Sequence, residues 1–158
     1  MSQISFNTPL GPLTITAEDD SIVSVDWGWA MEVEETPLLT AARDQIQDYF
    51  DGARKSFDLP LNPPGTAFQR RVWHAMSGIG YGQVITYGEL AEAVGSAPRA
   101  IGQACARNPL PILVPCHRVL GQANCGLGHY SGPEGPDDLE TKTRLLRLEG
   151  AALPASAA

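Results

Sequence analysis

The stretch Tyr87–Arg107, YGELAEAVGSAPRAIGQACAR, decides the fold of the C-terminal half of the chain. Its spacing predicts a helix from about Tyr87 to Val94, a turn at Gly95-Ser96, and a second helix from about Ala97 to Arg107. Pro98 falls in the first turn of the second helix, where its missing N–H would have no helical partner in any case. Two helices joined by a tight glycine turn are typical of a helix-turn-helix, and an ordinary pair of packed helices gives the same pattern.

The residues before this stretch predict a small antiparallel sheet, one helix and a linker. Apolar and polar residues alternate in short bursts over residues 3–27, as they do in a meander of strands. Thr36-Pro37 is a helix start and Gly52 a helix end, and the helix between them would cover one face of the sheet. Asn62-Pro63-Pro64-Gly65 has the composition of a linker. We therefore divide the chain into a structural α/β domain, a helical domain and a poorly ordered tail, at residues 1–63, 64–150 and 151–158.

The formal charge of the 158-residue chain is -7, which argues against a nucleic-acid binder that works by bulk basicity. Residues 1–65 contain 3 basic and 11 acidic side chains, residues 66–118 contain 5 and 2, and residues 119–158 contain 3 and 5. The helix-turn-helix stretch lies in the one basic segment, and charges farther than about 8 to 10 Å away are largely screened. Local attraction to DNA is compatible with this distribution, and so is a solvated face with a few arginines.

Composition restricts the class of protein further. With 43% hydrophobic and 18% charged residues, the chain can bury an ordinary core. No apolar run approaches the roughly 18 residues of a membrane helix and the N-terminus lacks a signal-peptide pattern, so we expect a cytoplasmic protein without a membrane partner. Three cysteines, Cys105, Cys116 and Cys125, have no CxxC spacing and few nearby histidines. We therefore expect neither disulfides nor a metal site.

The second helix of the predicted pair has an outer face of unusually small residues. At helical spacing, four residues share this face: Arg99, Gly102, Gln103 and Ala106. Glycine inside a helix costs about 1 kcal/mol relative to alanine, so Gly102 needs a reason. Close approach of the backbone to a partner such as a groove wall is one reason, and close helix packing is an equal alternative.

The most informative segment for chemistry is Pro115-Cys116-His117-Arg118-Val119. A thiol is a nucleophile only when ionised; its pKa is ordinarily near 8.5, and a neighbouring histidine or arginine lowers that pKa. Adjacent residues of a helix do not face one another, so His117 would reach Cys116 through a water molecule. A buried structural cysteine beside an ordinary histidine is the alternative.

Glu149 ends a helix that we predict from about Asp138 to Glu149. A carboxylate at this end opposes the helix dipole, and its spacing from Leu145 and Leu146 indicates partial burial. A buried carboxylate needs a partner. Glu149 would orient and charge His117 in a relay of cysteine, water, histidine and glutamate, or it would be a surface residue at a frayed helix end.

Taken together, these residues resemble the O6-alkylguanine-DNA alkyltransferase family, the methylated-DNA-protein-cysteine methyltransferases. Pro115-Cys116-His117-Arg118-Val119 matches the active-site signature of that family. The resemblance covers nearly the whole chain, and its other motifs are Thr8-Pro9-Leu10-Gly11-Pro12-Leu13, Phe68-Gln69-Arg70-Arg71-Val72-Trp73, Tyr81-Gly82, Thr86-Tyr87-Gly88-Glu89-Leu90-Ala91, Arg107-Asn108-Pro109 and Tyr130-Ser131-Gly132. The fold that it implies is α+β: a small N-terminal antiparallel sheet with one helix, a reduced ribonuclease H-like domain, followed by a mostly helical C-terminal domain with a helix-turn-helix.

The resemblance also implies a role for each matched residue. Cys116 is the expected methyl acceptor, His117 the base that acts through water, and Glu149 the carboxylate that orients this base. Asn108 would hold the turn that carries the cysteine. Around a flipped guanine, the expected contacts are the Tyr130 hydroxyl, the Ser131 backbone, and the carbonyls of Val114 and Cys116. On DNA they are Tyr87, which turns the phosphate, the arginine finger Arg99, and a minor-groove face of Gly102, Gln103 and Ala106.

The implied activity is direct, single-turnover transfer of a methyl or alkyl group from O6-alkylguanine in double-stranded DNA to Cys116. It requires base flipping, because the O6 atom lies inside the duplex stack. It implies no cofactor and no metal, and we expect a monomer. Two other classes compete with this hypothesis: a protein that binds alkylguanine without reacting, and a thiol hydrolase that uses Cys116 and His117 on a small acyl substrate.

One segment departs from the pattern of this family. After Tyr130-Ser131-Gly132 the chain continues through Pro133–Asp138, a longer connection than usual before the last helix. Its prolines stiffen it, and its carboxylates put negative charge near a site expected to meet phosphate. The substrate loop is therefore the part of the resemblance that carries over least.

Overall fold

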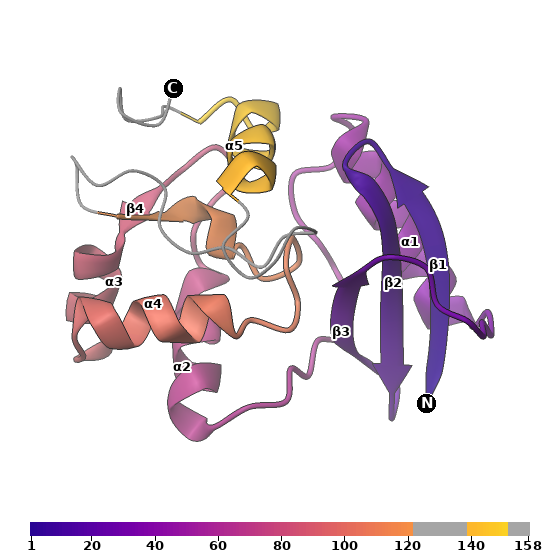
Figure 1. The fold of residues 1–158 in the computed structure, drawn as a ribbon, viewed down its shortest axis with the longest axis horizontal. Coiled ribbons are helices and arrows are strands. Elements are labelled where there is room, and N and C mark those ends of the chain that lie inside the picture. Colours follow the sequence, from indigo (N-terminus) through magenta and orange to yellow (C-terminus); the bar gives the residue numbers. More distant parts are fainter. Residues whose placement is uncertain (122–138, 152–158) are drawn as a thin grey trace. The chain divides into compact units, whose positions relative to one another are not determined.

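Three antiparallel strands and one helix form the N-terminal unit, Met1–Pro64, in the computed structural model, which describes residues 1–121 and 139–151. The strands β1 (Ser2–Thr8), β2 (Gly11–Glu18) and β3 (Ser21–Trp27) pair in the order β1-β2-β3 (Figure 1). In the central strand β2, Leu13 and Ile15 are completely buried. The small antiparallel sheet predicted from the alternating pattern is therefore confirmed.

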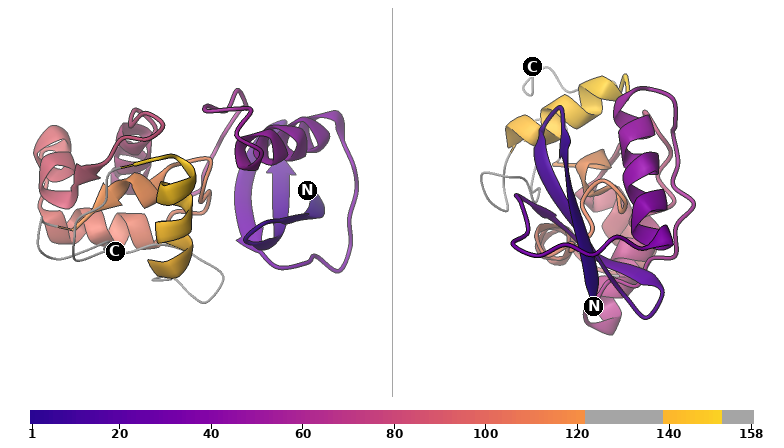
Figure 2. Two further views of the ribbon diagram at one scale, coloured as in Figure 1. Left: turned by 90° about the horizontal axis from the view of Figure 1, so that it is seen from above. Right: turned by 90° about the vertical axis from the view of Figure 1, so that its right-hand side faces the viewer.

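Helix α1 (Pro37–Phe50) covers one face of this sheet, as Figure 2 shows. The Thr36 hydroxyl accepts a hydrogen bond from the backbone N–H of Leu39 at 3.2 Å and so caps the helix start. The buried side of the helix consists of Leu39, Ala42, Ile46 and Tyr49. Gly52 follows the helix with a φ of +78°, a conformation that glycine adopts without strain.

The C-terminal unit, Gly65–Ala158, is mostly helical. Its elements are α2 (Ala67–Met76), β4 (Ile85–Thr86), α3 (Tyr87–Val94), α4 (Pro98–Ala106), the 3-10 turn η1 (Cys116–Arg118), β5 (Val119–Leu120) and α5 (Leu139–Leu148). The predictions for Cys125, Tyr130, Ser131, the connection 132–138 and the tail from 152 onward lie outside the described residues. None of the helices in the described part of the chain has the length and hydropathy of a membrane span.

Helices α3 and α4 form the predicted helix-turn-helix. Thr86 and Glu89 make a capping box at the start of α3: the Thr86 hydroxyl accepts from the Glu89 N–H at 3.0 Å, and the Glu89 carboxylate accepts from the Thr86 N–H at 3.1 Å. Gly95 ends α3 in the left-handed conformation, with a φ of +71°. The turn is tight because glycine takes this conformation at no steric cost.

A short parallel pairing of β4 with β5 joins the helix-turn-helix to the segment that follows Cys116. Ile85 pairs with Val119, and Thr86 with Leu120. The sequence did not predict this pairing, because two-residue strands are too short to show a period. It places the start of α3 beside the chain that leaves the η1 turn.

Helix α5 buries a face that is only partly apolar. Leu145 and Leu146 are completely buried, as predicted, and so is Lys142. Leu139 and Leu148, which the sequence assigned to the apolar face, are 44% and 36% exposed. The buried positions recur at a spacing of four residues, Thr141 with Leu145 and Lys142 with Leu146. The buried stripe of α5 is therefore regular, but it contains polar residues as well as leucines.

We expect Thr86→Ala to lower the free energy of unfolding by about 1 kcal/mol, because it removes the capping hydroxyl of α3. Urea denaturation followed by circular dichroism would measure the loss. Thr86→Ser keeps the hydroxyl and serves as the matched control. A serine variant that is destabilised as much as the alanine variant would contradict the capping role.

Candidate functional site

The segment that leads to Cys116 is held by the side chain of Asn108, which is 4% exposed. Its Nδ2 donates to the carbonyl of Val114 at 2.9 Å, and its Oδ1 accepts from the N–H of Leu110 at 2.9 Å. The Cys116 N–H also donates to Val114 O at 2.8 Å. This i to i+2 bond, with Pro115 at φ -81° and ψ 67°, makes an inverse γ-turn, which suits the restricted φ of proline.

The η1 turn buries three chemically active side chains in succession. Cys116 and His117 are completely buried, and Arg118 is 6% exposed. Burial of Arg118 is compensated by hydrogen bonds, since its Nη1 donates to the carbonyl of Ile79 at 2.6 Å. Its guanidinium also lies 5.9 Å from the centre of the Tyr81 ring.

The Glu149 carboxylate lies at the centre of the cluster and is completely buried. His117 Nε2 lies 2.7 Å from Glu149 Oε2. Arg118 binds both oxygens of the same carboxylate, with Nε donating to Oε1 at 2.8 Å and Nη2 to Oε2 at 2.9 Å. The Gly82 N–H donates to Oε1 at 3.3 Å. The structure thus brings His117 and Glu149 together and excludes the alternative of a surface glutamate.

Burial lowers the pKa of His117, because the surrounding protein disfavours the charged ring. The hydrogen bond that the ring donates to Glu149 and the charge of this carboxylate act in the opposite direction, and the charges of Arg118 and Lys142 reinforce the effect of burial. His117 is therefore neutral at pH 7. In the tautomer that donates Nε2–H to the carboxylate, Nδ1 is the nitrogen that can accept a proton.

The two cysteines of this unit that the structure describes occupy different chemical environments. Burial raises the pKa of the Cys105 thiol far above its usual range, and the nearby Cys116 raises it further. Cys105 Sγ donates to Met76 Sδ at 3.4 Å inside the apolar core. Cys105 therefore stays a packed thiol, whereas Cys116 directly precedes His117 and Arg118 in the η1 turn.

The predicted DNA-facing residues of α4 are only partly exposed. Arg99 and Gln103 are exposed, and Ala106 is half-buried. Gly102 is buried, so the expectation that it lies on the open outer face was wrong. The physical reason is that a glycine has only backbone atoms to expose, and in a helix its neighbours cover these atoms. Tyr87, the first residue of α3, is half-buried.

Sequence reasoning missed two members of the site. Arg118 was considered only as a neighbour of the thiol, yet it binds Glu149 with two hydrogen bonds. Lys142 was not singled out at all, although it is completely buried on α5. A lysine four residues before Leu146 on an apolar helix face was the available signal, because charged residues are almost never fully buried unless they are paired.

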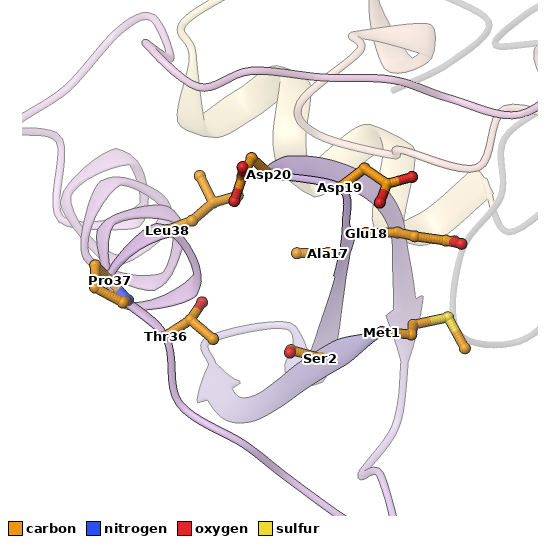
Figure 3. A pocket seen from close by; sticks show the side chains of 9 residues that line it. All are labelled: Met1, Ser2, Ala17, Glu18, Asp19, Asp20, Thr36, Pro37 and Leu38. Carbon is orange, nitrogen blue, oxygen red and sulfur yellow. The ribbon is translucent and has the colours of Figure 1, made fainter.

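A concave region lies in the N-terminal unit. A pocket of about 580 Å³ lies between the chain start, the β2–β3 turn and the start of α1 (Figure 3). Its polar groups are hydroxyls and the carboxylates of Glu18, Asp19 and Asp20. Its lining includes no cysteine and no histidine, and among the described residues no three histidine, cysteine or carboxylate side chains are grouped as a metal site would need. The chemistry is therefore assigned to the C-terminal unit.

Fold and site together define a class of protein in which a thiol site and a helix-turn-helix share the second of two domains. The family profile "6-O-methylguanine DNA methyltransferase, DNA binding domain" matches residues 67–151. The profile of its ribonuclease-like domain matches residues 1–63. The chain belongs to the 6-O-methylguanine DNA methyltransferase family.

Curated relatives and solved structures resemble the chain over nearly its full length. A methylated-DNA--protein-cysteine methyltransferase, constitutive, of Bacillus subtilis (strain 168) is 46% identical over 155 residues, which cover 90% of this chain and 91% of the relative. A methylated-DNA--protein-cysteine methyltransferase of Methanosarcina acetivorans is 39% identical, with 92% and 96% covered. The crystal structure of Mycobacterium tuberculosis OGT in complex with DNA is 34% identical with a TM-score of 0.82, and the match covers 99% of this chain and 97% of that one.

We expect His117→Gln to flatten the dependence of stability on pH below about pH 6.5. In the wild type the unfolded chain takes up a proton on His117 near its usual pKa of about 6.5, whereas the folded chain, in which this pKa is lowered, does not. The free energy of unfolding therefore decreases as the pH is lowered through this range, by up to about 1.4 kcal/mol per pH unit from this group.

Urea denaturation at pH 7.5, 6.5, 6.0 and 5.5 would measure this slope. His74→Gln, a change at an exposed histidine of the same unit, is the matched control and should keep the wild-type slope. Equal slopes in wild type and His117→Gln would contradict the neutral, buried state of His117.

Proposed function

We propose that this protein repairs DNA by transferring the alkyl group of O6-alkylguanine to Cys116, once per molecule. One observation carries the proposal: a completely buried cysteine is followed by a histidine hydrogen-bonded to Glu149, in the same unit as a helix-turn-helix. The first group is a soft nucleophile, the second a neutral base, and the third orients the base. Family membership and the likeness to a relative in complex with DNA support the same activity.

The transfer is a displacement at the alkyl carbon. The thiol proton of Cys116 passes through a water molecule to His117, and the sulfur then attacks the methyl carbon of O6-methylguanine. The new S–C bond forms as the C–O6 bond breaks. The guanine leaves with the bonding electrons and takes up one proton, so the products are S-methylcysteine and guanine. The thioether has no leaving group to restore the thiol, so the protein acts once and needs no cofactor or metal.

In this mechanism Nδ1 of His117 receives the proton, because Nε2 is engaged with Glu149 at 2.7 Å. Glu149 holds the ring in that tautomer and stabilises the imidazolium that forms transiently. Asn108 acts one step further away: its two hydrogen bonds define the turn on which Cys116 lies. Its role is positioning, since it does not touch the reacting atoms.

The helix-turn-helix delivers the damaged base to the cysteine from the minor groove. We assign to Tyr87 the rotation of the phosphate and to Arg99 the space that the flipped base leaves. Gln103 and Ala106 would lie along the groove. A damaged, weakly paired guanine costs less to extrude, which favours the substrate over normal guanine.

The guanine pocket would be completed by Tyr130, Ser131 and the Val114 carbonyl. This carbonyl already accepts hydrogen bonds from Asn108 and from the Cys116 N–H. A carbonyl has two lone pairs, so the exocyclic amine of guanine would compete with one of these donors. We therefore place the amine between Val114 O and Cys116 O rather than on Val114 alone.

The partner is double-stranded DNA that contains O6-alkylguanine, and we propose that the protein meets it in the cytoplasm as a monomer. The second candidate is a DNA-binding protein that recognises alkylguanine without reacting. Cys116 within the intact segment Pro115–Val119 favours transfer over mere recognition, because recognition requires no nucleophile.

With excess duplex containing methyl-labelled O6-methylguanine, we expect at most about one labelled methyl group per protein, all of it on Cys116. Mass spectrometry of peptides would locate the label. Cys116→Ala should retain none, and Cys105→Ala, which removes the other described thiol of the unit, should retain as much as the wild type. Repeated turnover or release of methanol would exclude the acceptor mechanism, and tight binding without label would favour the sensor.

Arg99→Ala should slow the repair of duplex DNA by tenfold or more while changing the reaction with free O6-methylguanine less than about twofold. The reason is that only the duplex requires a base to be extruded. Rates of methyl transfer to the two substrates would be compared in single-turnover experiments. Arg107→Ala is the matched control, because it removes the same charge from an exposed position at the end of α4. Equal slowing with both substrates would contradict the finger role.

A further inference from the structure

Lys142 is a buried lysine that the mechanism above does not use. It lies on α5 and is completely buried, one of the largest fully buried side chains in the described chain. A buried ammonium group is costly unless it is hydrogen-bonded or paired with another group. An apolar side chain would fill the same space at less cost, so the contacts of Lys142 indicate what it is for.

The first contact joins Lys142 to the strand that follows the active-site turn. Its Nζ donates to the carbonyl of Val119 at 2.6 Å. Val119 comes directly after Arg118, the last residue of the η1 turn that carries Cys116. A charged hydrogen bond at this point restrains the chain three residues after the nucleophile.

The second contact joins Lys142 to the helix-turn-helix. Its Nζ lies 5.8 Å from the centre of the Tyr87 ring, within the range of a cation–π interaction. Tyr87 is the first residue of α3 and follows Thr86 of β4. One ammonium group therefore contacts both the segment that leaves Cys116 and the first residue of the DNA-binding motif.

The strands between these contacts are too short to hold the two segments by themselves. β4 and β5 have two residues each and pair only through Ile85 with Val119 and Thr86 with Leu120. An isolated pair of this length has little stability of its own. Lys142 reaches from a third element, α5, and binds on both sides of the pair.

We propose that Lys142 is a positioning residue that couples Tyr87 to the placement of the Cys116 segment. When DNA binds Tyr87 and moves its ring, the ammonium group of Lys142 moves with it. Because this group is bound to the Val119 carbonyl, the turn that carries Cys116 is displaced as well. This inference rests on the proposed function, because it concerns how the duplex is repaired. The charge of Lys142 also acts on His117 and helps to keep that base neutral. The effect of losing this charge must therefore be distinguished from the effect of losing the coupling.

A double-mutant cycle tests the coupling. The single-turnover rate of methyl transfer from O6-methylguanine duplex is measured for the wild type, Lys142→Met, Tyr87→Leu and the double variant. We expect Tyr87→Leu to slow the wild type about tenfold but the Lys142→Met background about twofold or less, because the two residues act through each other. Tyr87→Phe removes only the hydroxyl and keeps the ring against the ammonium group. Its effect on the rate should therefore be the same in the wild type and in the Lys142→Met background.

Controls separate coupling from a purely structural role. Arg144→Met removes a positive charge from an exposed position on the same helix, and Tyr87→Leu should still cost about tenfold in that background. With free O6-methylguanine, which requires no base to be extruded, Lys142→Met reports any general disturbance of the base His117. Urea denaturation of each variant establishes that it is folded.

If Lys142→Met does not fold, Lys142→Gln repeats the cycle, since it keeps an N–H donor for Val119 and removes only the charge that faces the ring. Rates that multiply independently in the cycle would overturn the proposal. Failure of the wild type to transfer methyl groups from duplex would instead overturn the proposed function, so the two failures are distinguishable.

Discussion

The carboxylate of Glu149 is the group on which the C-terminal unit depends. It accepts hydrogen bonds from Arg118, from Gly82 and from the ring of His117, and so joins the end of α5, the connection before β4 and the η1 turn. Because the carboxylate is completely buried, removing any one partner would leave a charge or a polar group unpaired in the core. This ion pair is therefore one of the contacts that hold the η1 turn, together with the hydrogen bonds of Asn108 and Lys142.

In the proposed mechanism the same carboxylate serves both stability and chemistry. Arg118 balances its charge, so the ring of His117 can stay neutral and still be held by a hydrogen bond of 2.7 Å. A glutamate without the arginine would raise the pKa of the histidine and spoil it as a base near neutral pH. Burial is the larger cause that lowers the pKa of His117, and the charge of Arg118 reinforces it.

The net charge of -7 says little about the part of the molecule that meets DNA. Most of the acidic side chains belong to residues 1–65, which form the sheet and helix of the N-terminal unit. The helix-turn-helix and the η1 turn contain three basic residues, Arg99, Arg107 and Arg118. Arg118 is buried there, and Lys142 is buried on α5, so neither is available to phosphate. The exposed Arg99 therefore contributes a larger share of the proposed attraction to DNA than a count of basic residues indicates.

The sequence by itself determined the local features of this protein. The helix-turn-helix follows from a capping box at Thr86, the left-handed Gly95 and the proline in the first turn of α4, and these signals act between neighbours in the chain. Only the tertiary structure decided which face of α5 is buried, that Gly102 is covered, and that Arg118 and Lys142 bind Glu149 and Val119. Those contacts join residues more than twenty positions apart, and no local pattern specifies which distant groups burial will pair.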